Sequence, residues 1–555
     1  MSDAQADFVS LESITARHVG RTRQNLSSAE LAEEVIRRGE ANPAASGAVV
    51  VSQGRHTQRE LDATYVVSGS TREVCWLVGE RFAELGAAQF AALSRRLLAY
   101  LQGRDFYVQD LVVGAPAGDA RGGSQRCRVL TETAWHALLM RNLYGPALDA
   151  DAREPEPELT VVHAPGFAAV PERDGTRGAA ATIFFPARSL VYVCGTAYGG
   201  ELCAAVSTLA GVTAPASVLP LRGAVSVDDA GDAALFLGRT GTGKTALALD
   251  GTRRLLADHS VFWTAQGLVG CERGAYASVL NLDPAREPAI HAGTQQTGAV
   301  LENVALDPGS RQPDFADTRL AVNLRAAFRV DDGWGPGPGP VAGRTSGHPR
   351  HVFLLTRDTA GVLPPLARLT PEQAVFAFLI SYTSSLADTE AGQRDVRPDV
   401  EAALSNAPVA VSPAAYAKAF LERITQHGAT CWFVNTGWVG EPADRAERIE
   451  LSVTRTLIKA AVAGALDDVE MVRDPLFLFD VPQACPGVDP ALLNPRDQAE
   501  DSAEYEIRAN LLAKAFIDAF THFAEEMPAS VAEMVDSVVL FEDTLDVLEN
   551  FRLSF

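Results

Sequence analysis

The stretch Leu235-Phe236-Leu237-Gly238-Arg239-Thr240-Gly241-Thr242-Gly243-Lys244-Thr245-Ala246-Leu247 combines an apolar strand, a glycine-rich turn and the start of a helix. Its G-x-x-x-x-G-K-T spacing is typical of a phosphate-binding loop (P-loop), in which backbone N–H groups approach a polyphosphate. Lys244 is expected to neutralise the outer phosphates, and Thr245 to hold a magnesium ion. The residues expected to contact the nucleotide here are Gly238, Thr240, Gly241, Thr242, Gly243, Lys244 and Thr245. A chance glycine-rich turn is the alternative, and the flanking strand and helix patterns argue against it.

An acidic residue shortly after the loop is expected to assist this magnesium ion. Asp258 and His259 directly follow the apolar pair Leu255-Leu256. A phosphate-binding loop normally needs an acid at the end of an adjacent strand, which holds the magnesium through water. Asp258 is therefore predicted as a second metal residue, and His259 is a candidate base for an acceptor hydroxyl. The alternatives are a turn aspartate and a structural histidine.

The composition describes a globular chain with enough residues for two to four domains. The 555 residues are 47% hydrophobic and 21% charged, with a net charge of -22. Such a charge argues against nucleic acid or an anionic membrane as a partner. The N-terminus lacks a secretory signal, and no apolar run has the length of a membrane span. Seven widely spaced cysteines without a C-x-x-C pair indicate reduced thiols, so a cytoplasmic protein is expected.

Local patterns predict several helices and strands. A capping box, with Ser27 at the N-cap and Glu30 three residues later, predicts a helix that ends near Gly39. Apolar residues at helical spacing predict two more helices, around 90–101 and 512–523. Apolar and β-branched runs predict strands at 48–52, 159–162, 181–185, 190–194 and 351–356.

Several longer motifs follow the loop in a fixed order along the chain. They are V-L-E-N-V at 300–304, N-L-R-A-A-F at 323–328, G-V-L-P-P at 361–365, L-T-P-E-Q-A at 369–374, N-T-G-W at 435–438 and C-P-G-V at 485–488. Together with residues 238–247 they resemble the ATP-dependent phosphoenolpyruvate carboxykinase family, and the resemblance covers most of the chain. It implies an α/β fold with an N-terminal substrate-side domain, 1–221, and a C-terminal P-loop nucleotide-binding domain with a helical extension, 222–555. The active site is expected in the cleft between them.

The resemblance also implies roles for residues that match the family's motifs. Lys244 and Thr245 fall on the phosphate-binding lysine and the magnesium-binding threonine, and Arg325 falls on the γ-phosphate arginine. On the substrate side, Arg59 falls on the carboxylate-binding arginine and Tyr198 on the tyrosine near the substrate. The remaining matches on the nucleotide side are Glu302, Arg448, Ile449 and Thr454.

The sequence departs from the family where a second divalent metal, usually manganese, is implied. In the family this ion bridges the γ-phosphate and the enolate oxygen, held by a lysine, a histidine and an aspartate. The paired lysines are replaced here by Cys203 and Ala204, the histidine by Arg222 and the aspartate by His259. Arg222 at such a place repels a cation and attracts an anion, so it is predicted to bind substrate. A softer metal site of Cys203 and His259 is the alternative.

These observations favour a divergent family member that binds MgATP and transfers its γ-phosphoryl group to a non-standard small-molecule acceptor. Lys244, Arg325, Asp258 and His259 are the predicted catalytic residues, with ATP and Mg²⁺ as cofactors. One alternative is a genuine ATP-dependent phosphoenolpyruvate carboxykinase, acting on oxaloacetate with a rebuilt metal site. Another is a non-catalytic ATP-binding scaffold, whose C-terminal tail, 531–555, would bind a protein partner. The sequence predicts neither the acceptor nor the oligomeric state.

Overall fold

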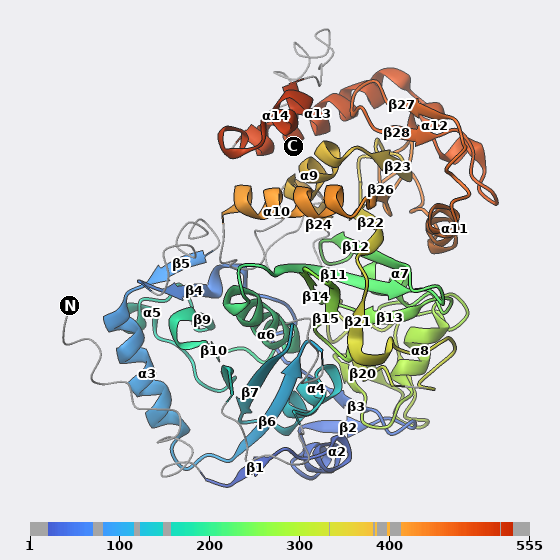
Figure 1. Ribbon diagram of the computed structural model, residues 1–555. Helices are drawn as coiled ribbons and strands as arrows, with labels where there is room; N and C mark the ends of the chain where they lie inside the picture. The colour runs from blue at the N-terminus through green and yellow to red at the C-terminus, as the bar shows by residue number, and fades with distance from the viewer. Residues whose placement is uncertain are drawn as a thin grey trace.

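The computed structural model describes residues 20–69, 82–115, 123–147, 157–331, 333–380, 383–385, 397–399, 412–521 and 523–536. Cys75 lies outside the described residues, and so does the predicted partner-binding tail beyond residue 536. The structure combines several sheets with helices (Figure 1), which confirms the predicted α/β fold class. No helix in the described part of the chain is long and apolar enough to cross a membrane.

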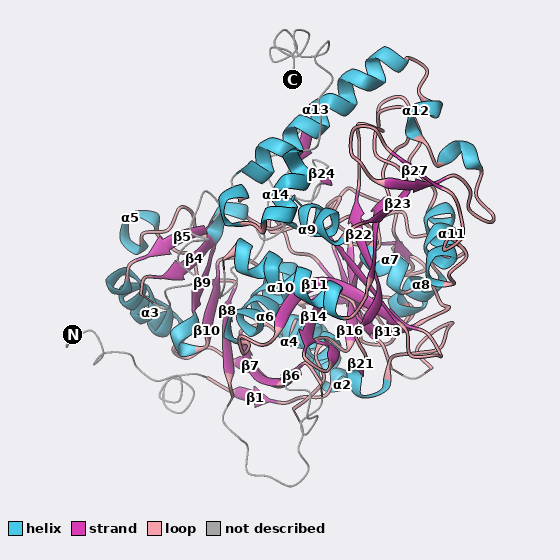
Figure 2. Ribbon diagram, turned by 45° about the horizontal axis from the view of Figure 1, so that its top comes forward, coloured by secondary structure: helices cyan, strands magenta, loops and turns pink. Residues whose placement is uncertain are grey.

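An eight-stranded mixed sheet occupies the N-terminal half of the structure, in the order β1-β6-β7-β8-β10-β9-β4-β5. In that order its strands are Thr22–Gln24, Phe106–Val113, Gln125–Thr131, Leu159–Ala164, Leu190–Cys194, Ala181–Phe185, Thr64–Val67 and Phe82–Leu85. Helices cover both of its faces (Figure 2). Successive strand residues point to opposite faces, so each face has its own core.

The two faces of this sheet pack against different helices. Helix α3 (Ala87–Leu101) packs against one face, where Phe90 and Leu97 join Phe106 of β6. Helices α4 (Ala134–Leu143) and α6 (Gly199–Thr213) pack against the other face. Helix α6 begins directly after Tyr198, so packing of α6 on the sheet fixes the position of this predicted substrate residue.

A second, eleven-stranded sheet carries the glycine-rich loop, in the order β21-β15-β14-β11-β12-β22-β26-β23-β28-β27, with β13 paired to β11. In that order its strands are Thr345–Ser346, Gly267–Gly270, Ser260–Thr264, Leu219–Val227, Ala233–Gly238, Pro349–Thr356, Thr430–Asn435, Leu366–Leu369, Asp480–Pro482 and Met471–Arg473, and β13 is Arg254–Ala257. The central strands β12, β22 and β26 are parallel. Their carboxyl ends therefore meet at one edge, where ligands bind in open α/β sheets.

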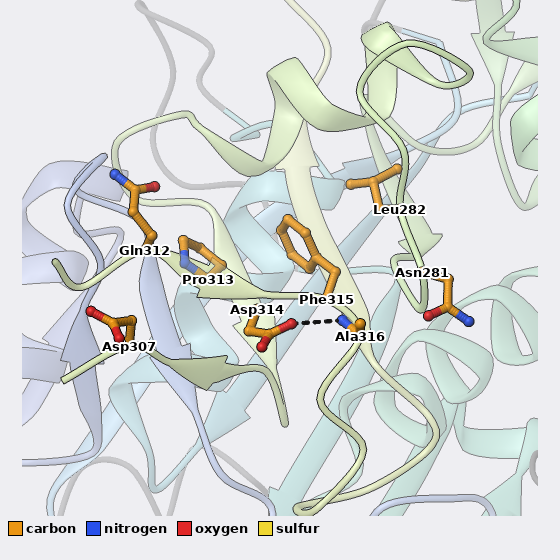
Figure 3. A pocket seen from close by; sticks show the side chains of 8 residues that line it. All are labelled: Asn281, Leu282, Asp307, Gln312, Pro313, Asp314, Phe315 and Ala316. Carbon is orange, nitrogen blue, oxygen red and sulfur yellow. Dashed lines mark hydrogen bonds between the residues drawn. The ribbon is translucent and has the colours of Figure 1, made fainter. Parts of the chain in front are cut away.

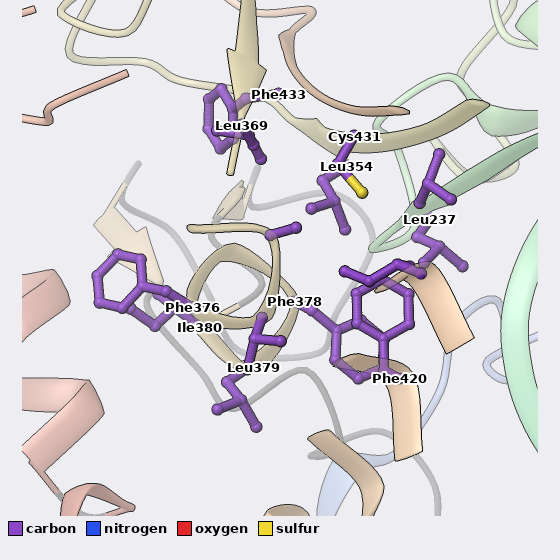
Figure 4. Close-up of a cluster of buried hydrophobic side chains, with 14 of the residues drawn as sticks. Leu237, Leu354, Leu369, Phe376, Phe378, Leu379, Ile380, Phe420, Cys431 and Phe433 are labelled. Carbon is purple, nitrogen blue, oxygen red and sulfur yellow. The ribbon is translucent and has the colours of Figure 1, made fainter. Parts of the chain in front are cut away.

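Helices cover this sheet on both faces as well. Helices α9 (Pro371–Ile380), α10 (Pro413–Gln426) and α13 (Ser502–Thr521) enclose one core, and Figure 4 shows part of it. There Phe378 of α9 stacks on Phe420 of α10 with ring centroids 4.3 Å apart. On the other face lie α7 (Lys244–Ala248) and α11 (Leu451–Val462), in a core that also includes residues of α8 (Pro288–Thr294).

A third, five-stranded sheet joins distant parts of the chain, in the order β16-β20-β17-β3-β2. In that order its strands are Gly274–Ser278, Arg325–Arg329, Val300–Glu302, Val49–Val51 and Ala41–Pro43. Strands β2 and β3 lie before the predicted domain boundary at 221/222 and the other three after it, and β11 runs across it. The boundary therefore stays a prediction, while the structure shows one sheet shared by both sides.

Most of the predicted local elements are present. The capping box of Ser27 and Glu30 opens α2 (Ser28–Arg37), and the predicted strands correspond to β3, β8, β9, β10 and β22. The helix after the glycine-rich loop, α7, is short and ends at Ala248. The remaining elements are α5 (Pro171–Asp174), α12 (Pro495–Gln498), α14 (Ala529–Asp536), β18 (Ala305–Leu306), β19 (Pro313–Asp314), β24 (Thr383–Ser385) and β25 (Arg397–Asp399).

Candidate functional site

The glycine-rich loop lies at the carboxyl edge of the parallel strands. Gly238 ends β12 and pairs with Leu355 of β22, and Thr356 pairs with Asn435 of β26. Residues that follow β22 and β26 therefore lie beside the loop, although they are far from it in sequence. This arrangement is the physical reason why the later motifs join the loop in one site.

The backbone of the loop depends on glycine. Gly241 and Gly243 have φ values of 87° and 92°, in the left-handed region that favours this residue. The Lys244 ammonium donates hydrogen bonds to the carbonyl oxygens of Gly238, at 2.7 Å, and Arg239, at 2.8 Å. The lysine thus lies folded against its own loop, where an incoming phosphate would compete with these two carbonyls.

Asp258 and Thr245 are placed to hold a hard cation. Oδ2 of Asp258 accepts a hydrogen bond from the backbone N–H of Tyr276 at 2.8 Å. The other oxygen, Oδ1, is buried and has no hydrogen-bond partner among the residues that the structure describes. Burial raises the pKa of Asp258, whereas the Thr245 hydroxyl acts in the opposite direction. An unpartnered carboxylate oxygen next to a hydroxyl fits Mg²⁺, which prefers oxygen ligands.

Arg222 and His259 contact each other directly, with 2.9 Å between Nη2 of the arginine and Nε2 of the histidine. Because a guanidinium can only donate, Nε2 accepts, and the proton of the neutral imidazole is on Nδ1. Burial lowers the pKa of His259 well below its ordinary value, and Arg222 and Lys244 lower it further. In this arrangement Nε2 accepts from Arg222 rather than taking a proton from an acceptor, so the predicted base role requires Arg222 to turn away.

The site has a strongly positive field around the loop lysine. Burial lowers the pKa of Lys244 to about 7, and Arg222 and Arg325 lower it further, whereas Asp258 raises it. Burial and the neighbouring Arg59 lower the pKa of Arg222 to about 10. The structure thus brings together cations that the sequence predicted separately, and such a group favours a polyanion.

Arg325 and Glu302 face each other across the shared five-stranded sheet. They are directly opposite in the pairing of β20 with β17. Glu302 accepts a hydrogen bond from the Tyr276 hydroxyl at 2.5 Å, and burial raises its pKa to about 7, whereas Tyr276 and Arg325 lower it. Gly199 allows this carboxylate to approach α6, because a Cβ atom there would come within 2.1 Å of Oε1.

Asn323 connects Arg325 to the substrate side. Its Oδ1 accepts from Nε of Arg325 at 2.9 Å, and its Nδ2 donates to the carbonyl oxygen of Thr57 at 2.9 Å. The Tyr198 hydroxyl lies 3.4 Å from the same Nδ2. One buried amide therefore fixes the relative positions of the γ-phosphate arginine, the predicted substrate tyrosine and the loop that precedes Arg59.

Arg59 is held by Glu201 of α6, with 2.8 Å between Nε and Oε2. Glu201 in turn accepts from the Thr182 hydroxyl at 2.8 Å. Both Arg59 and Arg222 are partly exposed, as expected for side chains that face a ligand. The predicted substrate residues therefore lie around the start of α6 and the first half of β11.

The predicted nucleotide segment lies against the loop from the β26 side. Arg448 donates through Nε to the carbonyl oxygen of Thr436 at 2.7 Å, and the Thr436 hydroxyl donates to the carbonyl oxygen of Thr242 at 3.2 Å. The backbone N–H of Ile449 donates a hydrogen bond to the carbonyl oxygen of Gly437 at 2.8 Å. Thr454 is buried in α11. Arg448 and Ile449 are thus brought to the loop through the residues that follow β26.

Sequence reasoning missed Arg357, Asn323 and Glu201 as parts of the site. Arg357 directly follows β22 and is 4% exposed. Its Nη1 lies 3.1 Å from the point that a Cβ atom on Gly241 would occupy, so the guanidinium packs against the loop. The signal that could have found it is its position after a strand parallel to β12, since such strand ends meet at one edge.

The described residues do not fit a second metal ion at the place that the resemblance implies. Among them, no group of three or more His, Cys, Asp or Glu side chains could hold a metal ion. Ala204 has no ligand atom, and the Arg222 guanidinium contacts the one nitrogen of His259 that has a lone pair. Burial raises the pKa of Cys203 well above its ordinary value, which disfavours the thiolate that a soft metal needs.

A cavity of about 480 Å³ lies apart from these residues, around the β18–β19 hairpin (Figure 3). Its acidic side chains are used within turns: Asp314 accepts from the backbone N–H of Ala316 at 3.0 Å, and Asp307 accepts from that of Ser310 at 2.7 Å. None of the predicted site residues lines it. The candidate site is therefore the loop edge and not this cavity.

An α/β fold with a glycine-rich loop at the carboxyl ends of parallel strands is typical of nucleotide-binding proteins. The model of the phosphoenolpyruvate carboxykinase family matches residues 20–491. The chain belongs to this family, which confirms the resemblance seen in its motifs.

Relatives match nearly the whole chain. "Phosphoenolpyruvate carboxykinase (ATP) 2" of Moorella thermoacetica is 39% identical over 516 residues, covering 93% of this chain and 96% of its own. The "Phosphoenolpyruvate carboxykinase (ATP)" of Mesorhizobium japonicum is 38% identical and covers 94% and 96%. That of Thermus thermophilus is 38% identical and covers 94% and 98%. All three names contain ATP, and all three name the carboxykinase reaction.

Proposed function

We propose that this chain is an ATP-dependent phosphotransferase with its nucleotide at the glycine-rich loop. The observation that supports this most is the convergence of three separate segments on one sheet edge. They are the loop with Lys244 and Thr245, Asp258 beside Thr245, and Arg448 connected through Thr436. The names of the relatives, which contain ATP, favour this nucleotide.

In this proposal Thr245 and Asp258 hold the magnesium ion, which when bound neutralises phosphate charge. Lys244 leaves the carbonyls of Gly238 and Arg239 and binds the outer phosphates. Arg325, oriented by Asn323, binds the transferring group. Catalysis then rests on positioned charge, because phosphoryl transfer requires little covalent chemistry from the protein.

The first candidate reaction is the one for which the relatives are named, formation of phosphoenolpyruvate from oxaloacetate and ATP. Identity of 36–39% over nine-tenths or more of the chain supports it. In this reaction Arg59, held by Glu201, would bind the acceptor's carboxylate, and Tyr198 would lie near the acceptor. This carboxykinase reaction is better supported by the comparisons than transfer to a non-standard acceptor.

A second candidate is transfer of the γ-phosphoryl group to a different small acceptor, and one contact favours it. Arg222 and His259 face each other where the resemblance implies a second metal ion, and they offer a guanidinium in place of ligands. An enolate next to a transferring phosphoryl group needs cations placed in advance. Loss of the metal ligands therefore favours an acceptor that forms no enolate.

One assay separates these candidates. The purified chain is incubated with oxaloacetate and ATP with magnesium, with and without manganese, and phosphoenolpyruvate is measured. Its formation supports the carboxykinase; its absence, together with ADP release during a screen of hydroxyl and amine acceptors, supports the second candidate. Binding of ATP without turnover of any compound would instead support the non-catalytic scaffold.

A further inference from the structure

The backbone places Arg222 at the entrance to the loop. Gly223 of β11 pairs with Leu237 of β12, so the preceding residue of β11 lies beside Gly238, where the loop begins. On its other side Arg222 pairs with Ser260 of β14. Two neighbouring strands therefore fix the backbone of this arginine next to the residues that would bind phosphate.

His259 determines where the guanidinium points. The backbone carbonyl oxygen of His259 accepts from the N–H of Gly223 at 3.0 Å, which holds the two residues side by side. Its Nε2 then accepts from Nη2 of Arg222 at 2.9 Å. A guanidinium has five N–H donors in a planar fork, so one arginine can contact a histidine nitrogen and a phosphate oxygen at the same time.

We propose that Arg222 binds oxygens of the transferring γ-phosphoryl group of the nucleotide, and that His259 is the positioning residue that holds its guanidinium in place. This inference rests on the proposed function, because it takes the nucleotide phosphates to lie at the glycine-rich loop. Arg222 would then contribute a positive charge to the phosphate site, next to Lys244 and Arg325.

The charges around the loop lysine support this assignment. Burial lowers the pKa of Lys244 most, and Arg222 is the second cause, ahead of Arg325 and Arg239. A ligand that reaches the Lys244 ammonium is therefore within the field of Arg222 as well. Three cations around one position fit a group with three anionic oxygens, and planar guanidinium groups suit phosphate geometry.

The test compares MgATP with MgADP, because only ATP has the γ-phosphate. Arg222→Met is expected to weaken MgATP binding by at least about tenfold, as for loss of a charge-assisted hydrogen bond. Binding of MgADP should change much less, and isothermal titration calorimetry measures both. Arg222→Lys should keep part of the preference for ATP. An unchanged ratio of ATP to ADP affinity in Arg222→Met would overturn the proposal.

Three further variants separate binding from folding. Arg253→Met removes an arginine that lies on the same sheet, with Nε 3.0 Å from the Ser226 hydroxyl. It is expected to lower thermal stability without changing the ATP to ADP ratio. His259→Gln keeps a hydrogen-bond acceptor for Arg222, so it should retain the wild-type ratio of ATP to ADP affinity. His259→Leu has no acceptor and should lose this preference for ATP. Equal affinity ratios in the two variants would overturn the positioning role. Wild-type protein that binds neither nucleotide would instead contradict the proposed function itself.

Discussion

The carboxylate Oε1 of Glu302 lies where a Cβ atom on Gly199 would come within 2.1 Å of it. This contact joins β17 of the shared sheet to the first residue of α6. It fixes how closely the substrate side approaches the predicted γ-phosphate arginine, since Arg325 lies opposite Glu302.

We expect Gly199→Ala to destabilise the protein by about 1–3 kcal/mol, because the added methyl group must displace a buried carboxylate. Chemical denaturation monitored by intrinsic fluorescence measures the free energy of unfolding. Gly178→Ala is the matched control, since a Cβ atom there would meet nothing within 4 Å. Equal stabilities of the two variants would show that the contact is dispensable.

Asn323→Leu should reduce phosphoryl transfer more than it reduces nucleotide binding. The substitution removes the acceptor for Arg325 and the donor to Thr57 and keeps a similarly branched side chain. A misplaced charge near the reacting group costs roughly 10²-fold in rate. Steady-state kinetics should therefore show a lower kcat with a nearly unchanged affinity for MgATP. A variant with wild-type kcat would contradict the connecting role of Asn323.

Thr245→Val should weaken MgATP binding while leaving metal-free ATP binding nearly unchanged. The valine keeps the shape of threonine but lacks the hydroxyl that is predicted to hold magnesium. Titrations with ATP in the presence of Mg²⁺ or of a chelator measure the difference. Thr252→Val, at an exposed hydroxyl that bonds Asp250 at 2.7 Å, serves as the control. Identical magnesium dependence in both variants would argue against the assignment.

The buried pair of His136 and His163 predicts acid sensitivity. The rings lie 4.2 Å apart, and burial lowers the pKa of His163 to about 4, against an ordinary 6.5. The unfolded chain therefore binds a proton that the folded chain does not, so the free energy of unfolding decreases as the pH falls from 6.5 towards 4.

The full shift of His163 corresponds to about 3 kcal/mol, at roughly 1.4 kcal/mol per pKa unit. His163→Gln should therefore lose less stability than the wild type between about pH 7 and about pH 5. Urea unfolding at both pH values provides the comparison. Parallel losses in the two proteins would mean that His163 is not a source of the acid sensitivity.

Sequence patterns were sufficient to predict the local helices and strands and the protein family. The capping box of Ser27, the strand before Gly238 and the helical stripe at 512–523 are encoded within a few residues of each other, so periodicity and turn chemistry predict them. The collinear motifs predicted the family, because they recur in order over most of the chain.

The contacts within the site could not be predicted in the same way. Arg222 and His259 are 37 positions apart, and Asn323 reaches Thr57 over 266 positions. Periodicity identifies which residues share an element, but not which elements become neighbours in space.

The shared five-stranded sheet has a consequence for synthesis of the chain. Gln53, just after β3, bonds to Asn303, just after β17, and 250 positions separate them. At about 5–20 residues per second, a ribosome needs roughly 10–50 seconds to reach the partner strand. During that time the newly made β3, Val49–Val51, has no β17 with which to pair. The early strands therefore complete their sheet only when most of the nucleotide side has emerged, and the two sides are expected to finish folding together.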